Sequence, residues 1–317
     1  MIELGNWFVS CYQGKSMPEL HYSEEVWEAL EAKQPIVGLE TAVVTHGLPY
    51  PVNVELAQAM ENVIRQEGAV PATVAVLGGK PQIGLKKEDI LLLAQDRDVI
   101  KVSRRDFARA AARKLNGGTT VAGTITALHL AGIKVFATGG IGGVHRDAPF
   151  DVSADLFTLA ETPILVVCAG AKSILDLPAT LEKLETLSVP VVGYQTSVFP
   201  AFYSRSSGLA VDISVEEPAD VAALVQAHWD MGVNSAVVLA VPPPVLDALP
   251  EEEMQLAVDQ ALEEARQHDI HGQKVTPYLL KRVSELTGKA SLKANLGLLL
   301  NNARVAARSA LELAKLG

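Results

Sequence analysis

The sequence from Pro163 to Ser173 reads PILVVCAGAKS and joins a predicted strand to a reactive side chain. The apolar run after the proline predicts a strand that is buried on both faces, as in a parallel sheet. The small residues that follow predict a turn at the carboxyl end of that strand, the edge where open α/β sheets bind ligands. Apolar surroundings and a nearby helix N-terminus would help the Lys172 amine to lose its proton there and attack a carbonyl carbon. The alternative is a solvated lysine at the start of a helix.

Strands and helices alternate along the rest of the chain. We predict a buried strand over Pro35–Val44, a helix capped by Asn53, a helix over Gly117–Ala131, and helices from Glu251 onward. This alternation predicts a three-layer α/β/α fold with a largely parallel, mixed central sheet and a helical C-terminal segment. We expect a single domain over residues 35–317, preceded by an N-terminal extension over residues 1–34.

The composition limits the kinds of partner. With 317 residues, of which 49% are hydrophobic and 20% charged, the chain can form a large core. Its formal net charge of −10 argues against nucleic acid, because phosphate neutralisation requires a basic face. No apolar run reaches the roughly 18 residues of a membrane span, and the N-terminus lacks the pattern of a signal peptide. We therefore expect a cytoplasmic protein that acts on small molecules.

Two segments suit an anion. Gly139–Arg146 (GGIGGVHR) follows a predicted strand, and its glycines would let backbone N–H groups approach a phosphate. It matches neither a Walker loop nor a complete dinucleotide fingerprint, so the adjoining His145 and Arg146 carry the phosphate interpretation, with a tight turn as the alternative. Lys101–Asp106 (KVSRRD) ends another predicted strand with a basic cluster, which is either an anion clamp or a surface cluster.

Glu40 stands inside the otherwise apolar stretch Ile36–Val44. Apolar surroundings raise the pKa of a carboxyl group, so that it can serve as a general acid near neutral pH. The alternative is a buried salt bridge, because an unpaired buried glutamate is costly.

Three residues that alternate along the chain offer oxygen ligands. Asp151, Ser153 and Asp155 suit Mg²⁺ or Mn²⁺, which prefer carboxylate, hydroxyl and water. The alternative, which the spacing alone favours, is a helix that Ser153 caps and whose dipole Asp155 stabilises. Further along, Asn295 places an amide in an apolar helix, where it needs either a helix partner or a ligand.

Several segments together resemble the pseudouridine-5′-phosphate glycosidases, also named the indigoidine synthase A-like family. The likeness runs in the same order from about residue 35 to the C-terminus and leaves residues 1–34 outside. The segments that carry it are ETAVVTHGLPYPVN (40–53), GAVPAT (68–73), KVSRRD (101–106), FATGGIGGVHR (136–146), CAGAKSILD (168–176), GYQT (193–196) and FPAFYSR (199–205).

The resemblance implies a reversible reaction in which pseudouridine 5′-phosphate and water give uracil and ribose 5-phosphate, with Mn²⁺, in a homotrimer. By the family pattern, Lys172 forms a Schiff base with the ring-opened sugar, Glu40 is the proton donor and Asp151 binds the metal. The substrate-binding residues implied in the same way are Lys101, Val121, Thr138, His145, Ser153, Ala154, Asp155 and Asn295. Of these, Lys101, Thr138 and His145 would hold the sugar phosphate, and Asn295 would contact the base.

The chain departs from the family pattern in two places. The loop Asp147–Phe150 is shorter than usual, and Val241–Pro244 replaces the usual Asn-Pro-Ile-Pro. Because the short loop lies beside the implied metal site, a C-glycosyl synthase that attaches ribose 5-phosphate to another aromatic acceptor is the alternative enzyme. A non-catalytic phosphosugar-binding protein is a third hypothesis, which the acid in an apolar strand argues against.

Overall fold

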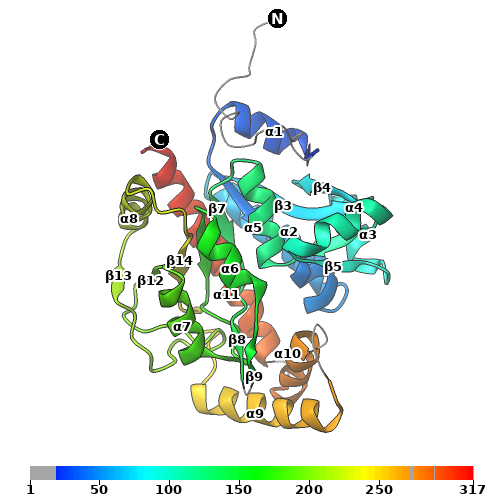
Figure 1. The fold of residues 1–317 in the computed structure, drawn as a ribbon, viewed down its shortest axis with the longest axis vertical. Coiled ribbons are helices and arrows are strands. Elements are labelled where there is room, and N and C mark those ends of the chain that lie inside the picture. The colour runs from blue at the N-terminus through cyan, green and yellow to red at the C-terminus, as the bar shows by residue number, and fades with distance from the viewer. Residues whose placement is uncertain (1–18, 147, 271–274, 289, 317) are drawn as a thin grey trace, which may run out of the picture.

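A central sheet with helices on both sides forms the body of the protein (Figure 1). The structure is a computed structural model that describes residues 19–146, 148–270, 275–288 and 290–316. The sheet is mixed and mostly parallel, so the predicted architecture is confirmed. Residues 1–18 of the predicted extension lie outside the described residues.

The main sheet has parallel neighbours along most of its length. In spatial order its strands are β1 (His21–Tyr22), β4 (Lys80–Ile83), β3 (Val70–Leu77), β2 (Ile36–Leu39), β7 (Val135–Ala137), β10 (Leu165–Cys168), β14 (Val237–Ala240), β12 (Val191–Tyr194) and β13 (Ile213–Val215). β6 (Gly117–Thr119) pairs with β3, and β5 (Ile100–Val102) pairs with β6. β3 runs antiparallel to β4 and to β6. A separate antiparallel sheet has the order β11 (Leu175–Asp176), β8 (Val144–His145) and β9 (Ala148–Val152).

The helices connect these strands and cover the sheet. They are α1 (Glu24–Glu31), α2 (Val52–Gln66), α3 (Lys87–Gln95), α4 (Phe107–Arg113), α5 (Val121–Leu130), α6 (Ala154–Glu161), α7 (Leu177–Thr186), α8 (Pro218–Asp230), α9 (Glu251–Gln267), α10 (Val275–Leu286) and α11 (Ala290–Ala314). α11 packs on α2 and α8 and lies across β2, β7 and β10, which confirms the helical C-terminal segment. Among the helices of the described residues, none combines the length and apolarity that a bilayer crossing requires.

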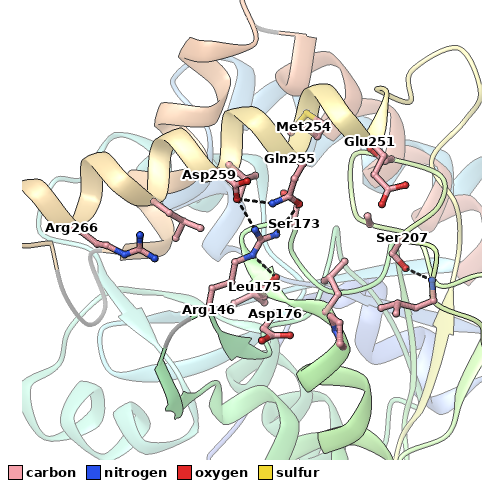
Figure 2. A pocket seen from close by; sticks show the side chains of 17 residues that line it. Arg146, Ser173, Leu175, Asp176, Ser207, Glu251, Met254, Gln255, Asp259 and Arg266 are labelled. Carbon is pink, nitrogen blue, oxygen red and sulfur yellow. Dashed lines mark hydrogen bonds and ion pairs between the residues drawn. The ribbon is translucent and has the colours of Figure 1, made fainter.

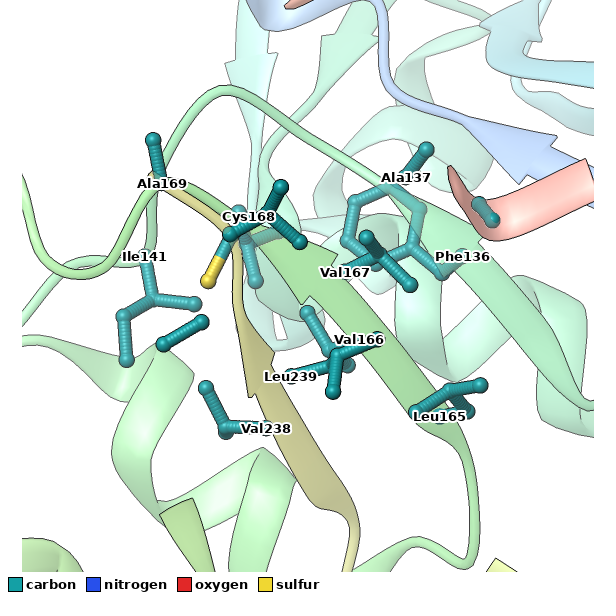
Figure 3. Close-up of a cluster of buried hydrophobic side chains, with 14 of the residues drawn as sticks. Phe136, Ala137, Ile141, Leu165, Val166, Val167, Cys168, Ala169, Val238 and Leu239 are labelled. Carbon is teal, nitrogen blue, oxygen red and sulfur yellow. The ribbon is translucent and has the colours of Figure 1, made fainter. Parts of the chain in front are cut away.

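β10 lies at the centre of the core, as its apolar run predicts. Leu165–Cys168 are fully buried, because parallel strands flank β10 on both edges and helices cover both faces. Figure 3 shows these side chains packed with Phe136 of β7 and Val238 of β14. Burial raises the pKa of the Cys168 thiol to about 12, so this cysteine is a protonated core residue and not a nucleophile.

The described part of the predicted extension belongs to this body. β1 pairs with β4, and Ser23 caps α1 by accepting a hydrogen bond from the Val26 backbone N–H. Val26 and Ala29 are fully buried in the main core. Residues 19–34 therefore pack against the sheet and do not form a separate unit.

Local structure differs from the prediction in three places. The strand predicted over Pro35–Val44 ends at Leu39, and a single π-helical turn (Val43–Gly47) follows. Asn53 does not cap α2: its amide lies inside the first turn and donates to the Val44 carbonyl. The predicted helix over Gly117–Ala131 begins only at Val121, because Gly117 and Gly118 form β6, where side chains at these positions would collide with Val102 and Thr45.

Candidate active site

Three neighbouring strands end side by side and each leads to a polar residue. β2, β7 and β10 are adjacent in the sheet. Glu40 follows β2, Thr138 follows β7, and Lys172 lies beyond the turn that follows β10. Because the carboxyl ends of parallel strands share one edge, residues that are far apart in sequence meet here.

The turn that carries Lys172 is held by backbone contacts. Gly170 adopts φ +83°, and a side chain there would collide with the Pro200 carbonyl oxygen, so glycine is required. After the turn the chain pairs again with the segment beyond β7, and the Lys172 N–H donates to the Ile141 carbonyl at 3.1 Å. The alternative of a lysine at the start of a helix is wrong, because β11 comes next and α7 begins only at Leu177.

Glu40 is enclosed by groups that act on its carboxyl in opposite directions. Burial raises the pKa of Glu40, against the opposing effects of the Lys172 ammonium and of the hydrogen bond that the Thr138 hydroxyl donates. The predicted raised pKa is thus confirmed, although Glu40 lies just after a strand and not within one. A carboxyl group that keeps its proton toward neutral pH can act as a general acid.

Lys101 brings a second amine to the same place. Burial lowers the pKa of Lys101, and the nearby Lys172 ammonium lowers it further, whereas Asp155 and Glu40 oppose this. Two amines and one carboxyl therefore share a partly desolvated space, an arrangement that is typical of catalytic sites.

The cavity around these groups has two lobes that meet at Glu40, Ala42, Lys101 and Lys172. The helical lobe, of about 70 Å³, is walled mainly by apolar groups and by the Asn295 amide; its other lining residues are Val43, His46, Gly47, Gly139, Gly140, Phe202, Leu280 and Leu299. The hairpin lobe, of about 340 Å³, has a mixed lining of basic, acidic, hydroxyl and apolar residues, namely Ser103, Arg105, Asp106, Thr120, Val121, Gly142, His145, Asp151, Val152, Ser153, Ala154, Asp155 and Leu175. The larger lobe suits an anionic polyol and the smaller one a flat, largely apolar ring.

Of the site residues that the family pattern implies, only Thr138 is absent from the lining of these lobes. Its side chain is fully buried, and its hydroxyl donates to Glu40. In this structure Thr138 therefore contacts the Glu40 carboxyl without lining the cavity itself.

Asp155 and Ser153 organise the wall of the hairpin lobe. The two carboxylate oxygens of Asp155 accept hydrogen bonds from Ala122 N–H at 2.9 Å and from Gly142 N–H at 2.8 Å. The Ser153 hydroxyl accepts from the Asp155 N–H at 3.2 Å and caps α6, so the predicted Ser153 cap is confirmed. Asp155 thereby joins the start of α5 to the glycine-rich run.

Asp151 is the exposed carboxylate of the hairpin lobe. It lies on β9, with its Oδ2 at 4.0 Å from His145 Nδ1. Among the described residues, no three His, Cys, Asp or Glu side chains form a group that could enclose a metal ion. One exposed carboxylate still fits a hard divalent cation that keeps most of its waters and shares a substrate phosphate.

The glycine-rich run serves packing more than anion binding. Backbone N–H groups of Ile141, Gly142 and Val144 donate to Gly170, Asp155 and Thr180. A Cβ at Gly140 would come within 2.6 Å of the Phe202 ring, and side chains at Gly142 and Gly143 would also collide with their neighbours. The tight-turn interpretation of these glycines is therefore the better one, and His145 is the residue of this run that offers a ring nitrogen to the lobe.

Some lining residues have no sequence signal of their own. Phe202, Leu280 and Leu299 reach the helical lobe from a loop and two helices, and nothing in their spacing distinguishes them from core residues. Arg105, in contrast, belongs to the predicted basic cluster, and its position in the hairpin lobe supports the anion-clamp interpretation.

The family described as "Indigoidine synthase A like protein" matches residues 25–312, a range that includes most of α1. A pseudouridine-5′-phosphate glycosidase of Caldanaerobacter subterraneus subsp. tengcongensis is 49% identical over 296 residues, which cover 93% of this chain and 96% of the relative. One of Escherichia coli K12 is 49% identical over 306 residues, which cover 95% and 98%.

Two solved structures share the fold. The prealnumycin C-glycosynthase AlnA, in complex with ribulose 5-phosphate, is 38% identical with a TM-score of 0.87, covering 94% of this chain and 97% of AlnA. An indigoidine synthase A-like protein of Thermotoga maritima is 33% identical with a TM-score of 0.87, covering 96% and 99%. A match over nearly the full length, together with a cavity that collects the family's motif residues, shows that this chain belongs to the indigoidine synthase A-like family.

Proposed function

We propose that the protein catalyses the reversible cleavage of the C-glycosidic bond of pseudouridine 5′-phosphate to uracil and ribose 5-phosphate. The observation that carries the proposal is the meeting of Glu40 and Lys172 at the junction of the two lobes. A sugar at this junction has a phosphate-compatible lobe on one side and a ring-sized lobe on the other. The relatives named above, at 49% identity over nearly the whole chain, support the same activity.

The bond to be cleaved joins two carbon atoms, so the leaving ring must take up a proton on carbon. The free amine of Lys172 forms a bond to C1′ as the bond from C1′ to the ring oxygen of the sugar breaks, and one proton of the nitrogen passes to that oxygen, which leaves a neutral secondary amine and a free hydroxyl. Glu40 gives its proton to C5 of uracil, and the electron pair of the nitrogen forms the C1′=N iminium as the C1′–C5 bond breaks. Water then hydrolyses the iminium, which releases ribose 5-phosphate and regenerates the amine, and the proton set free returns to the Glu40 carboxylate.

The raised pKa of Glu40 suits it to this proton transfer, because the acid stays protonated closer to neutral pH. The Thr138 hydroxyl orients the carboxyl and stabilises the carboxylate that proton donation leaves. The iminium that forms on Lys172 adds a positive charge nearby, which favours the same product.

The two lobes divide the substrate between them. Arg105, His145 and Lys101 would bind the phosphate in and beside the hairpin lobe, while Asn295 would hydrogen-bond the uracil edge in the helical lobe. Val121, Ser153, Ala154 and Asp155 would line the sugar.

We expect Lys101→Met to weaken phosphate binding without removing the reacting groups. A hydrogen bond to a charged group contributes about 1.5–3 kcal/mol, so the KM for pseudouridine 5′-phosphate should rise by roughly 10- to 150-fold. Steady-state kinetics measure this, with Lys134→Met as the matched control, since Lys134 lies over the Trp229 ring outside both lobes. An unchanged KM would show that Lys101 does not contact the phosphate.

Asp151 is the residue that would hold Mn²⁺, together with waters and the substrate phosphate. When bound, the ion would neutralise phosphate charge in the hairpin lobe. Removal of divalent ions with EDTA should lower activity, and Asp151→Asn should shift the half-activating Mn²⁺ concentration upward by about tenfold or more. A Mn²⁺ titration of both proteins tests this, and coincident activation curves would remove Asp151 from the metal site.

The family resemblance also implies a homotrimer. Phe150 supports association, because this aromatic side chain is 99% exposed and stands next to Asp151 on β9. Light scattering coupled to gel filtration should give three times the 33.7 kDa mass of one chain.

Uracil release from pseudouridine 5′-phosphate, followed by chromatography with the metal varied, tests the activity directly. The likeness to AlnA supports a second candidate, a synthase that joins a pentose phosphate to another aromatic acceptor. Borohydride trapping of ribose 5-phosphate on the protein, without turnover of uracil in either direction, would favour the synthase.

A further inference from the structure

Arg146 points away from the cavity that contains the reacting groups. His145 ends β8 and Arg146 begins the turn after it, and the two residues line different cavities. His145 lines the hairpin lobe, whereas Arg146 lies in a separate cavity of about 540 Å³ beside α9 (Figure 2). The expectation that both residues bind phosphate is therefore wrong for Arg146.

The guanidinium of Arg146 binds the segment that carries Lys172. Its Nη2 donates to the Ser173 carbonyl at 3.0 Å and its Nε to the Leu175 carbonyl at 3.1 Å. Its Nη1 donates to Asp259 of α9 at 3.0 Å (Figure 2). Because Ser173 directly follows Lys172, the first bond acts one residue from the proposed nucleophile.

Backbone bonds hold the same segment from the other side. Lys172 N–H donates to the Ile141 carbonyl, and Leu175 pairs with His145 across the two short strands. The Ser173 hydroxyl is buried and has no hydrogen-bond partner among the described residues, so it adds no restraint. Arg146 is thus the side chain that ties the carbonyls beyond Lys172 to the β8 hairpin.

We propose that Arg146 is a positioning residue that fixes the Lys172 segment relative to His145, and so sets where the amine stands against a sugar held by its phosphate. The inference rests on the proposed function. The lysine side chain is a flexible four-carbon chain. The position of the backbone at residue 172 therefore limits where the amine can lie. Two carbonyls set two residues apart suit the planar fork of a guanidinium, which a lysine ammonium cannot reproduce.

Arg146→Lys keeps the positive charge and removes the fork. A misplacement of about 1 Å costs up to roughly 100-fold in rate, so we expect kcat for uracil release to fall by about 10- to 100-fold. The KM for pseudouridine 5′-phosphate should stay within about threefold, and the rate of borohydride trapping of ribose 5-phosphate on Lys172 should fall in parallel with kcat.

Two controls separate this role from packing. Asp259→Asn removes the ion pair to α9 but leaves both carbonyl bonds, so its kcat should stay within about threefold of the wild type. Arg308→Lys makes the same substitution at an ion pair with Glu67, outside both lobes.

Each outcome decides the matter. Wild-type kinetics in Arg146→Lys would overturn this inference but not the proposed function. An Asp259→Asn variant that loses as much kcat as Arg146→Lys would also overturn it, because the contact between Arg146 and α9 would then be the cause. Equal losses of kcat and of phosphate binding, with a lowered melting temperature, also overturn it in favour of a role in folding. A wild-type protein that neither releases uracil nor traps ribose 5-phosphate refutes the proposed function, and this inference falls with it.

Discussion

Replacing Lys172 by alanine should lower uracil release by about 10⁴-fold or more and abolish the borohydride-trapped sugar adduct. In the proposed mechanism C–C cleavage needs an electron sink, and Lys172 supplies the iminium nitrogen. Lys172→Arg should be equally inactive, because a guanidinium keeps the positive charge but is no nucleophile at neutral pH. The measurements are uracil release and the mass of the intact protein after reduction with ribose 5-phosphate.

Lys101 makes this experiment sharper, since a second amine with a lowered pKa shares the cavity. Peptide mapping of the reduced wild-type protein should place the adduct on residue 172, and Lys101→Met should still be trapped there. An adduct on Lys101, or an active Lys172→Ala variant, would refute the proposed mechanism.

Replacing Glu40 by glutamine should lower kcat by about 10²–10⁴-fold, the range in which positioned acids and bases contribute. The amide keeps the shape and still accepts the Thr138 hydroxyl hydrogen bond, but it has no proton to give. The pH dependence gives a second test. Because burial raises the pKa of Glu40, wild-type kcat should fall as the pH rises through that pKa, and this limb should be absent in the variant.

Glu61 provides the matched control for Glu40. It is also a buried glutamate with a pKa raised by burial, and it also accepts a hydrogen bond from a threonine, Thr73. Glu61 belongs to α2 and lies outside both lobes, so Glu61→Gln should keep near wild-type activity. A comparable loss in both variants would show that buried glutamates support the fold here and not the chemistry.

The same pKa shift has a consequence for stability. The folded state binds the Glu40 proton more tightly than the unfolded state, so this group destabilises the fold as the pH rises from the unfolded pKa through the raised folded one. At pH 7, Glu40→Gln should therefore melt at or above the wild-type temperature while losing activity. A thermal melt of both proteins checks this, and a clearly lower melting temperature would contradict it.

The layered fold could be predicted because short continuous apolar runs are typical of parallel strands that helices cover on both faces. The run up to Cys168 is buried on both faces and lies in the centre of the sheet, as its composition indicates. The strand at Pro35–Val44 was predicted too long for a physical reason. Apolar residues continue to Val44, but Thr41 turns its hydroxyl to the Val74 carbonyl and the chain enters a helical turn. Composition alone cannot show such an end.

The candidate site was predictable at the residues whose ionisable side chains stand beside apolar segments. An acid next to an apolar strand and a lysine after a small-residue turn both reach the cavity. Contacts set by side-chain direction were not predictable. Arg146 and His145 are neighbours in sequence and face opposite cavities, and Thr138 reaches the site only through its bond to Glu40.

The two residues proposed to react and those proposed to bind the ring belong to different parts of the scaffold. Glu40 directly follows β2, and Lys172 lies beyond the turn that follows β10. β7 separates these two strands, so hydrogen-bonded neighbours about 4.8 Å apart set the spacing of their strand ends. Leu280, Asn295 and Leu299 come instead from α10 and α11. If these roles hold, changes confined to two C-terminal helices would alter the accepted aromatic ring without moving Glu40 and Lys172. A chimera that exchanges only those helices with a synthase of this family should keep its lysine adduct and acquire the donor's choice of acceptor.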